Sequence, residues 1–163
     1  MFWRRMLDAM ILVLTRLGYE RILRLLLKLG ADASAMNDHG WTPLMKASSY
    51  GLPSIVGLLM KHGATVNVGN DQCCTALMLA AGQGHAEICR LLIENGASIN
   101  SRSEKQWTAL MMAADNGHYL VANLLVENGA DTTLTTNLGW TALMLALVKG
   151  HHQIAKYLVR NGA

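Results

Sequence analysis

The sequence predicts an all-α solenoid of about five helix-turn-helix units, with short β-hairpin fingers between the units. Two series of glycines define the period. One series is Gly18, Gly51, Gly84, Gly117 and Gly150, and the other is Gly30, Gly63, Gly96, Gly129 and Gly162. Both series advance by 33 residues at every step. The segment 75–97 shows the unit most clearly, as two short apolar helices back to back, and a fixed period of this length is typical of stacked repeats.

The first unit, residues 1–36, keeps only the second half of the pattern. We predict a long first helix over residues 4–17, which covers the end of the stack as an N-terminal cap. Helical spacing places four apolar side chains of this helix on one stripe: Met6, Met10, Val13 and Leu17. Leu12 is expected on the open side of the helix.

The second unit, residues 37–69, has the clearest helix signals. Thr42 is a candidate N-cap, and Pro43 follows at the first helical position, where a missing amide hydrogen costs nothing. We predict a first helix over residues 43–50 and a second that starts at Pro53. Three side chains of the second helix are expected to face inward: Ile55, Leu58 and Leu59. Small residues in one register allow neighbouring units to approach closely: Ala47, Ala80, Ala113 and Ala146.

The later units differ from the second mainly in their fingers. These units are residues 70–102, residues 103–135 and a truncated last unit, residues 136–163. The tight-turn glycine at Gly40 and Gly139 is replaced by Cys73 and Gln106. If these positions need a positive φ, each replacement costs about 1 kcal/mol. The last unit has no further repeat to cover it, so we expect an open face there, with three exposed leucines: Leu143, Leu147 and Leu158.

Three motifs carry a resemblance to a known family. They are Gly-x-Thr-Pro-Leu at residues 40–44, Gly-His-x-x-Ile at residues 84–88, and a Leu-Leu pair shortly before Gly-Ala at the end of the second helix in the first four units. Together they resemble the ankyrin repeat, over about four full repeats and a divergent first one. The resemblance implies the solenoid fold and a binding role in general, because one scaffold carries many unrelated binding functions.

Charge and cysteine content exclude several classes of function. Residues 1–30 hold six basic and two acidic residues, whereas the other 133 hold eight basic and nine acidic residues. A basic end on a near-neutral body is not the basic stripe that nucleic acids require. No apolar run approaches the roughly 18 residues of a membrane span, so none is expected. Three cysteines without metal-ligand spacing indicate reduced thiols and a cytoplasmic or nuclear location.

No residue pattern indicates catalysis, a metal or a cofactor. His85, His118 and His151 are one unit apart, about 10 Å, which is far beyond shared coordination at about 2 Å, so we predict structural roles. Four methionines replace a histidine that is frequent in the family, and we predict that they fill the core: Met45, Met78, Met111 and Met144. Cys89 lies on a core-forming helix and is predicted to be a buried, inert thiol. We therefore expect a protein that is not an enzyme.

Trp41, Trp107 and Trp140 precede the N-cap threonine of their units, and Cys74 holds the equivalent place in the third unit. In ankyrin proteins this position lies on the finger and faces the concave groove, where it is used to contact ligands. An aromatic side chain there could equally support the finger against its neighbour. The resemblance implies a protein or peptide partner held on the concave face by these residues: His39, Trp41, Ser49, Tyr50, Cys74, Gln83, Glu104, Lys105, Trp107, Asp115, Asn116, Trp140 and Lys149.

Two other functions stay open at this point. The uncapped C-terminal face could associate with a second copy or continue into a longer array. The tryptophans could also form a cage for methylated lysine. Tryptophans spaced one unit apart suit an extended peptide better than a single cage.

Overall fold

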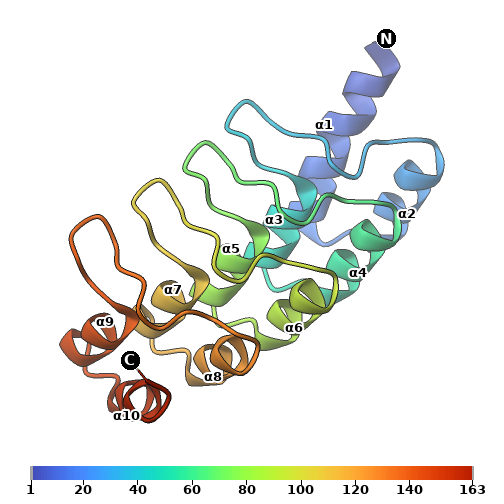
Figure 1. The fold of residues 1–163 in the computed structure, drawn as a ribbon. Helices are drawn as coiled ribbons and strands as arrows, with labels where there is room; N and C mark the ends of the chain where they lie inside the picture. Colours follow the sequence, from blue (N-terminus) through green and yellow to red (C-terminus); the bar gives the residue numbers. More distant parts are fainter. Residues whose placement is uncertain (1, 163) are drawn as a thin grey trace.

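The computed structural model describes residues 2–162, where ten helices form five consecutive pairs (Figure 1). Residues 1 and 163, the expected ends of the solenoid, lie outside the described residues. The first helices of the pairs are α1 (Phe2–Leu17), α3 (Pro43–Ser49), α5 (Ala76–Gly82), α7 (Ala109–Asp115) and α9 (Ala142–Val148). The second helices are α2 (Glu20–Lys28), α4 (Pro53–Lys61), α6 (Ala86–Glu94), α8 (Tyr119–Glu127) and α10 (His152–Arg160).

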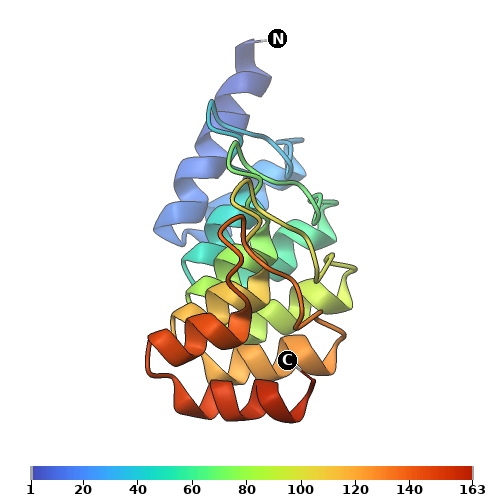
Figure 2. The same cartoon turned by 60° about the vertical axis from the view of Figure 1, so that its left-hand side comes forward.

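The pairs stack in register and make an elongated solenoid with the two termini at opposite ends (Figure 1). Each first helix contacts the first helix of the next pair, and each second helix contacts the next second helix. Figure 2 shows the resulting two rows of helices. The fingers all project in the same direction from the row of first helices (Figure 1). The predicted all-α repeat solenoid is therefore confirmed.

Threonine N-caps start the short first helices, as predicted for Thr42. The hydroxyl of Thr42 accepts a hydrogen bond from the amide of Met45 at 3.2 Å. The same bond recurs at Thr75, Thr108 and Thr141, where the distances are 3.4, 3.3 and 3.3 Å. Each cap satisfies an amide that has no partner inside its helix, which matters most in helices of only seven residues.

The core runs along the stack between the two rows of helices. Leu92 on α6 is fully buried, as are its counterparts Leu59, Leu125 and Leu158. The alanines predicted for close approach have no exposed surface at all: Ala47, Ala80, Ala113 and Ala146. Burying one leucine side chain contributes roughly 1.5–3 kcal/mol. The inward positions predicted for Ile55, Leu58 and Leu59 are confirmed.

Helix α1 presents the opposite face to that expected. Leu12 was predicted on the open side, but it is buried together with Ile11 and Thr15 on the face that packs towards α3. The stripe of Met6, Met10, Val13 and Leu17 is exposed instead, between 37% and 57%. The run Ile11-Leu12-Val13-Leu14 makes α1 apolar on several sides, so the spacing alone allows two stripes. The helix also begins at Phe2 rather than at residue 4.

The residues exposed on the open C-terminal face differ from the three leucines predicted there. Leu147 is 53% exposed, as expected, but Leu143 is half-buried and Leu158 is fully buried. Met144 is 48% exposed, so it does not fill the core as its counterparts Met45, Met78 and Met111 do. Its side chain lies at a position that a following unit covers everywhere else in the stack. No helix among residues 2–162 is both long and apolar enough to cross a membrane.

Candidate functional site

Each finger is closed by one polar side chain at its base. In the first finger, Oδ1 of Asn37 accepts hydrogen bonds from the backbone amides of His39 and Trp41, at 3.0 and 2.9 Å. In the other fingers the acceptor is Asn70, Ser103 or Thr136, and it bonds the amide of Cys74, Trp107 or Trp140 at 3.0, 3.1 or 3.2 Å. A side-chain oxygen that binds backbone amides a few residues ahead fixes a tight turn. The tryptophan position is therefore rigidly held.

Cys73 and Gln106, which stand where other fingers have a turn glycine, do adopt a positive φ, the condition on which the expected cost depended. Cys73 has a φ of 57° and Gln106 a φ of 63°, close to the 70° of Gly40 and the 79° of Gly139. Positive φ is unfavourable for residues with a Cβ atom. The turns keep the same geometry in spite of this, because the polar side chain at the base of each finger holds them closed.

Neighbouring fingers are joined by backbone hydrogen bonds. The amide of Asp71 donates to the carbonyl of His39 at 3.3 Å, and the amide of Glu104 donates to the carbonyl of Gln72 at 2.9 Å. The amide of Asn137 donates to the carbonyl of Lys105 at 3.2 Å. The four fingers therefore form one connected edge, and a partner would meet a preformed surface rather than separate loops.

Two adjoining hollows lie between the fingers and the first helices in the C-terminal half of the stack. The first has a volume of about 320 Å³ and is lined by Gln72, Cys74, Ser103, Glu104, Lys105, Trp107 and Met112. The second has a volume of about 400 Å³ and is lined by Trp107, Asp115, Thr136, Leu138, Trp140, Leu145, Val148 and Lys149. Trp107 lines both hollows, so it stands at the junction. We call the two hollows together the finger groove.

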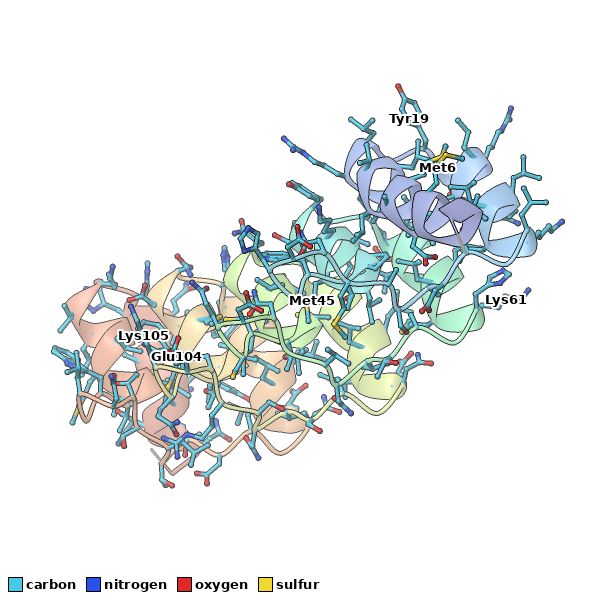
Figure 3. All side chains as sticks on the ribbon, turned by 90° about the horizontal axis from the view of Figure 1, so that it is seen from above. Met6, Tyr19, Met45, Lys61, Glu104 and Lys105 are labelled. Atoms are coloured by element: carbon cyan, nitrogen blue, oxygen red, sulfur yellow. The ribbon has the colours of Figure 1, made fainter. Side chains whose placement is uncertain are left out.

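The finger groove combines apolar walls with charged groups. Leu138 is 78% exposed, Val148 is 69% exposed and Trp140 is 37% exposed, although all three are apolar. The ammonium of Lys149 lies 3.5 Å from a carboxylate oxygen of Asp115. Glu104 and Lys105 lie exposed on the finger beside the first hollow, away from the helices that carry Met6 and Tyr19 (Figure 3). Such a surface can hold a polypeptide through apolar side chains and orient it through charges.

The predicted contact residues fall into two groups. Seven of them line the finger groove: Cys74, Glu104, Lys105, Trp107, Asp115, Trp140 and Lys149. The other six do not line it: His39, Trp41, Ser49, Tyr50, Gln83 and Asn116. His39 lies on the exposed first finger, and Trp41 packs half-buried against the core. Tyr50, Gln83 and Asn116 occupy the C-terminal ends of α3, α5 and α7 and are exposed.

Several groove residues were not expected from the sequence. Met112 and Val148 are apolar side chains that helical spacing does not distinguish from core residues, and Leu138 is an apolar residue of the last finger. Ser103 and Thr136 do carry a signal, because Asn37, Asn70, Ser103 and Thr136 follow the same step of 33 residues. A polar residue repeated four residues before the tryptophan position identifies the base of the finger.

The repeated histidines have a structural role. Nε2 of His85, His118 and His151 lies 3.3, 3.0 and 3.1 Å from a backbone carbonyl oxygen of the preceding unit. These carbonyls belong to Ser49, Gly82 and Asp115, at the ends of the first helices, where carbonyl groups lack partners. Among residues 2–162 no group of three or more His, Cys, Asp and Glu residues is placed to hold a metal ion.

The three cysteines are free thiols in different environments. Cys89 has no exposed surface, and burial raises its pKa to about 12. Burial and, to a lesser degree, Cys73 also raise the pKa of Cys74. Because the thiolate is the reactive form, both thiols are poor nucleophiles at neutral pH.

Comparison with known proteins agrees with this architecture. A family model described as ankyrin repeats (3 copies) matches residues 9–103, 65–136 and 102–163. No curated protein matches the chain as a relative. The matched ranges overlap and extend over all five helix pairs.

Proposed function

Because the chain belongs to the ankyrin repeat family, whose members are generally protein–protein interaction modules, we propose that it is a non-enzymatic binding module for a peptide or protein partner. The partner would lie along the concave face, in the finger groove, with Trp107 as its central anchor. The free thiols fit a cytoplasmic or nuclear location, as the cysteine pattern predicts.

One observation carries the proposal: Trp107 lines both hollows of the finger groove. Aromatic side chains near the centre of an interface commonly contribute most of its binding energy. Trp107 is half-buried, so its ring is already ordered before a partner arrives. The joined fingers add to this preorganisation, because a rigid surface loses little conformational entropy on binding.

A selection from a displayed peptide library, with the intact protein as bait, tests the proposal. We expect selected peptides to bind Trp107→Ala more weakly by at least about 2 kcal/mol, which is roughly thirtyfold. Trp41→Ala is the matched control, because Trp41 has the same place in its unit but lines neither hollow. Thermal unfolding of both variants separates lost binding from lost structure. Full binding by a folded Trp107→Ala variant would show that the tryptophan only supports the fingers.

A reader of methylated lysine is a second candidate. Trp107, Trp140 and Asp115 line one hollow, and aromatic rings with a carboxylate are suited to a quaternary ammonium group. Lys149 already lies beside Asp115, which favours an ordinary peptide over a cation in this hollow. A trimethyl-lysine peptide that binds no better than its unmethylated form would exclude the cage.

Self-association through the C-terminal face is a third candidate. Met144 and Leu147 are about half exposed, whereas their counterparts Met111 and Ala114 are at most 1% exposed beneath a following unit. A second copy could cover them. Sedimentation of the protein over a range of concentrations would then show a rising mass, and a constant mass of one chain would exclude this candidate.

A further inference from the structure

The N-terminal end of the stack exposes an unusual number of large apolar side chains. We define the N-terminal face by seven residues, four on α1, two on α2 and one at the C-cap of α2: Met6, Met10, Val13, Leu17, Ile22, Leu25 and Leu29. They are exposed by 37% to 63%. Figure 3 shows Met6 on α1 at this end of the solenoid, with Tyr19 projecting beyond the helices. The N-terminal face lies at the opposite end of the stack from the finger groove.

Repeat stacking explains only part of this face. Ile22 corresponds to Ile55 and Ile88, which are at most 2% exposed, so a preceding unit could in principle cover Ile22. Val13 and Leu17 correspond to Lys46 and Tyr50, which are not buried stacking positions. The helix that carries them has 16 residues instead of seven. The stripe on α1 therefore belongs to a surface that the other units do not have.

Basic side chains flank the apolar stripe. Arg16 lies on α1, and Arg21, Arg24 and Lys28 lie on α2, all of them exposed. Arg24 forms an ion pair with Glu20, in which Nη2 of Arg24 lies 2.7 Å from Oε1 of Glu20. Residues 1–30 as a whole carry six basic and two acidic residues. An apolar stripe with a cationic border is the pattern of helices that lie in the interface of an anionic membrane.

Charge excludes a second copy as the occupant of the N-terminal face. Two such faces in contact would bring two basic segments together. Contact between the N-terminal face of one copy and the C-terminal unit of another would also bring basic residues together. Residues 136–163 contain Lys149, Lys156 and Arg160 and no acidic residue. A lipid surface also suits the shape, since the stripe from Met6 to Leu17 on α1 is straight and about 17 Å long, and lipid insertion requires no complementary hollow.

We propose that the N-terminal face docks on anionic lipid membranes, with the apolar stripe of α1 and α2 inserted between the headgroups. Arg16, Arg21 and Lys28 contact the lipid phosphates and carboxylates. Helix α1 lies in the membrane plane, and the finger groove at the other end of the stack stays accessible to a partner in solution.

Co-sedimentation of the full chain with vesicles tests this docking. We expect binding to vesicles of phosphatidylcholine with phosphatidylserine, weaker binding to phosphatidylcholine alone, and weaker binding in high salt. Each of Arg21→Gln and Lys28→Gln should lower binding about fivefold, the factor that corresponds to about 1 kcal/mol per basic residue. Lys61→Gln and Arg90→Gln, which change equally exposed basic residues in the middle of the stack, should leave binding unchanged.

The apolar part of the face is tested by the double variant Val13→Glu with Leu17→Glu, which should lose vesicle binding. The matched control is Leu120→Glu with Val159→Glu, which alters two exposed apolar residues on α8 and α10 by the same charge. Circular dichroism confirms that both variants fold. Absence of vesicle binding by the unaltered chain would overturn the proposal. So would equal loss in both double variants, or a dimer that Val13→Glu with Leu17→Glu dissociates.

Discussion

The imidazole of His118 lies directly against Gly84, so that a Cβ atom added to Gly84 would stand 2.5 Å from Nδ1 of the ring. Nε2 of the same ring is 3.0 Å from the carbonyl oxygen of Gly82. Gly84 has a φ of 78°, which is itself unfavourable for other residues. Gly51 with His85 and Gly117 with His151 repeat the arrangement. The histidine thus couples one unit to the next, and the glycine makes room for it.

We expect Gly84→Ala to destabilise the fold far more than Gly96→Ala. Gly96 has a similar φ of 82°, but nothing lies within 4 Å of an added Cβ atom. Gly96→Ala should therefore cost only the backbone strain, about 1 kcal/mol. Gly84→Ala should cost a further 1–3 kcal/mol, roughly, because the ring must move and its hydrogen bond is lost. Urea unfolding measures both, and equal losses would show that the ring adapts freely.

Truncation of the central leucine tests the predicted helix register. Leu92 is fully buried and its counterparts repeat along the stack, so Leu92→Ala should lower the free energy of unfolding by roughly 2–5 kcal/mol. Leu120→Ala is the control, because Leu120 is 72% exposed and should change stability by less than about 0.5 kcal/mol. A loss below about 1 kcal/mol at Leu92 would mean that α6 relaxes around the cavity far better than cores normally do.

Most of the scaffold could be predicted because its signals are local and repeated. The threonine caps, the turn glycines and the small alanines each follow from one position of the unit, and the structure places them as expected. The orientation of α1 could not be predicted in this way, since Ile11 to Leu14 are all apolar and this helix has no full counterpart in other units. Only contact with α3 decides that Leu12 is buried and Val13 is exposed.

The candidate site was less predictable than the scaffold. The period of 33 residues identifies Trp107 and Trp140, but the hollows depend on how neighbouring fingers lean together, as in the bond from the Glu104 amide to the Gln72 carbonyl. Leu138 and Val148 line the second hollow as exposed apolar residues of the last unit. Their exposure reflects what packs beyond them, which the residues of one unit do not reveal.

Cys89 should make stability depend on alkaline pH. Its pKa is raised by burial from 9.0 to about 12, so the folded state holds the thiol proton more tightly than the unfolded state. The stabilisation is complete below about pH 9 and is lost as the pH rises towards 12. Between about pH 8 and pH 10 the unaltered protein should lose roughly 1.4 kcal/mol more than Cys89→Ala. Alanine already occupies the equivalent positions 122 and 155. Parallel pH profiles for the two proteins would show that the pKa of the thiol is the same in the folded and unfolded states.

Restoring glycine at a finger turn should stabilise the protein. Gln106 has a φ of 63°, whereas Gly139 meets the same requirement without a Cβ atom. Gln106→Gly should raise the free energy of unfolding by up to about 1 kcal/mol, less the entropy that glycine gains in the unfolded chain. Thermal unfolding measures the change. Asn116→Gly is the control, because Asn116 has a φ of −93° and a ψ of 0°, which any residue adopts. That variant should therefore not be stabilised.

Amide hydrogen exchange should separate the last unit from the middle of the stack. Helices α3 to α8 have a neighbouring unit on both sides. Among residues 2–162, α9 and α10 have one on only one side and leave Met144, Leu147 and Val148 exposed. In a linear array each unit is stabilised chiefly by its nearest neighbours, so a terminal unit opens more often. Exchange should be slow in α3 to α8 and fast from about Gly150 onwards. If protection is uniform at low protein concentration, the contacts of α10 with α8 and α9 are enough to stabilise the last unit. If protection becomes uniform only as the concentration rises, a second copy covers the C-terminal face.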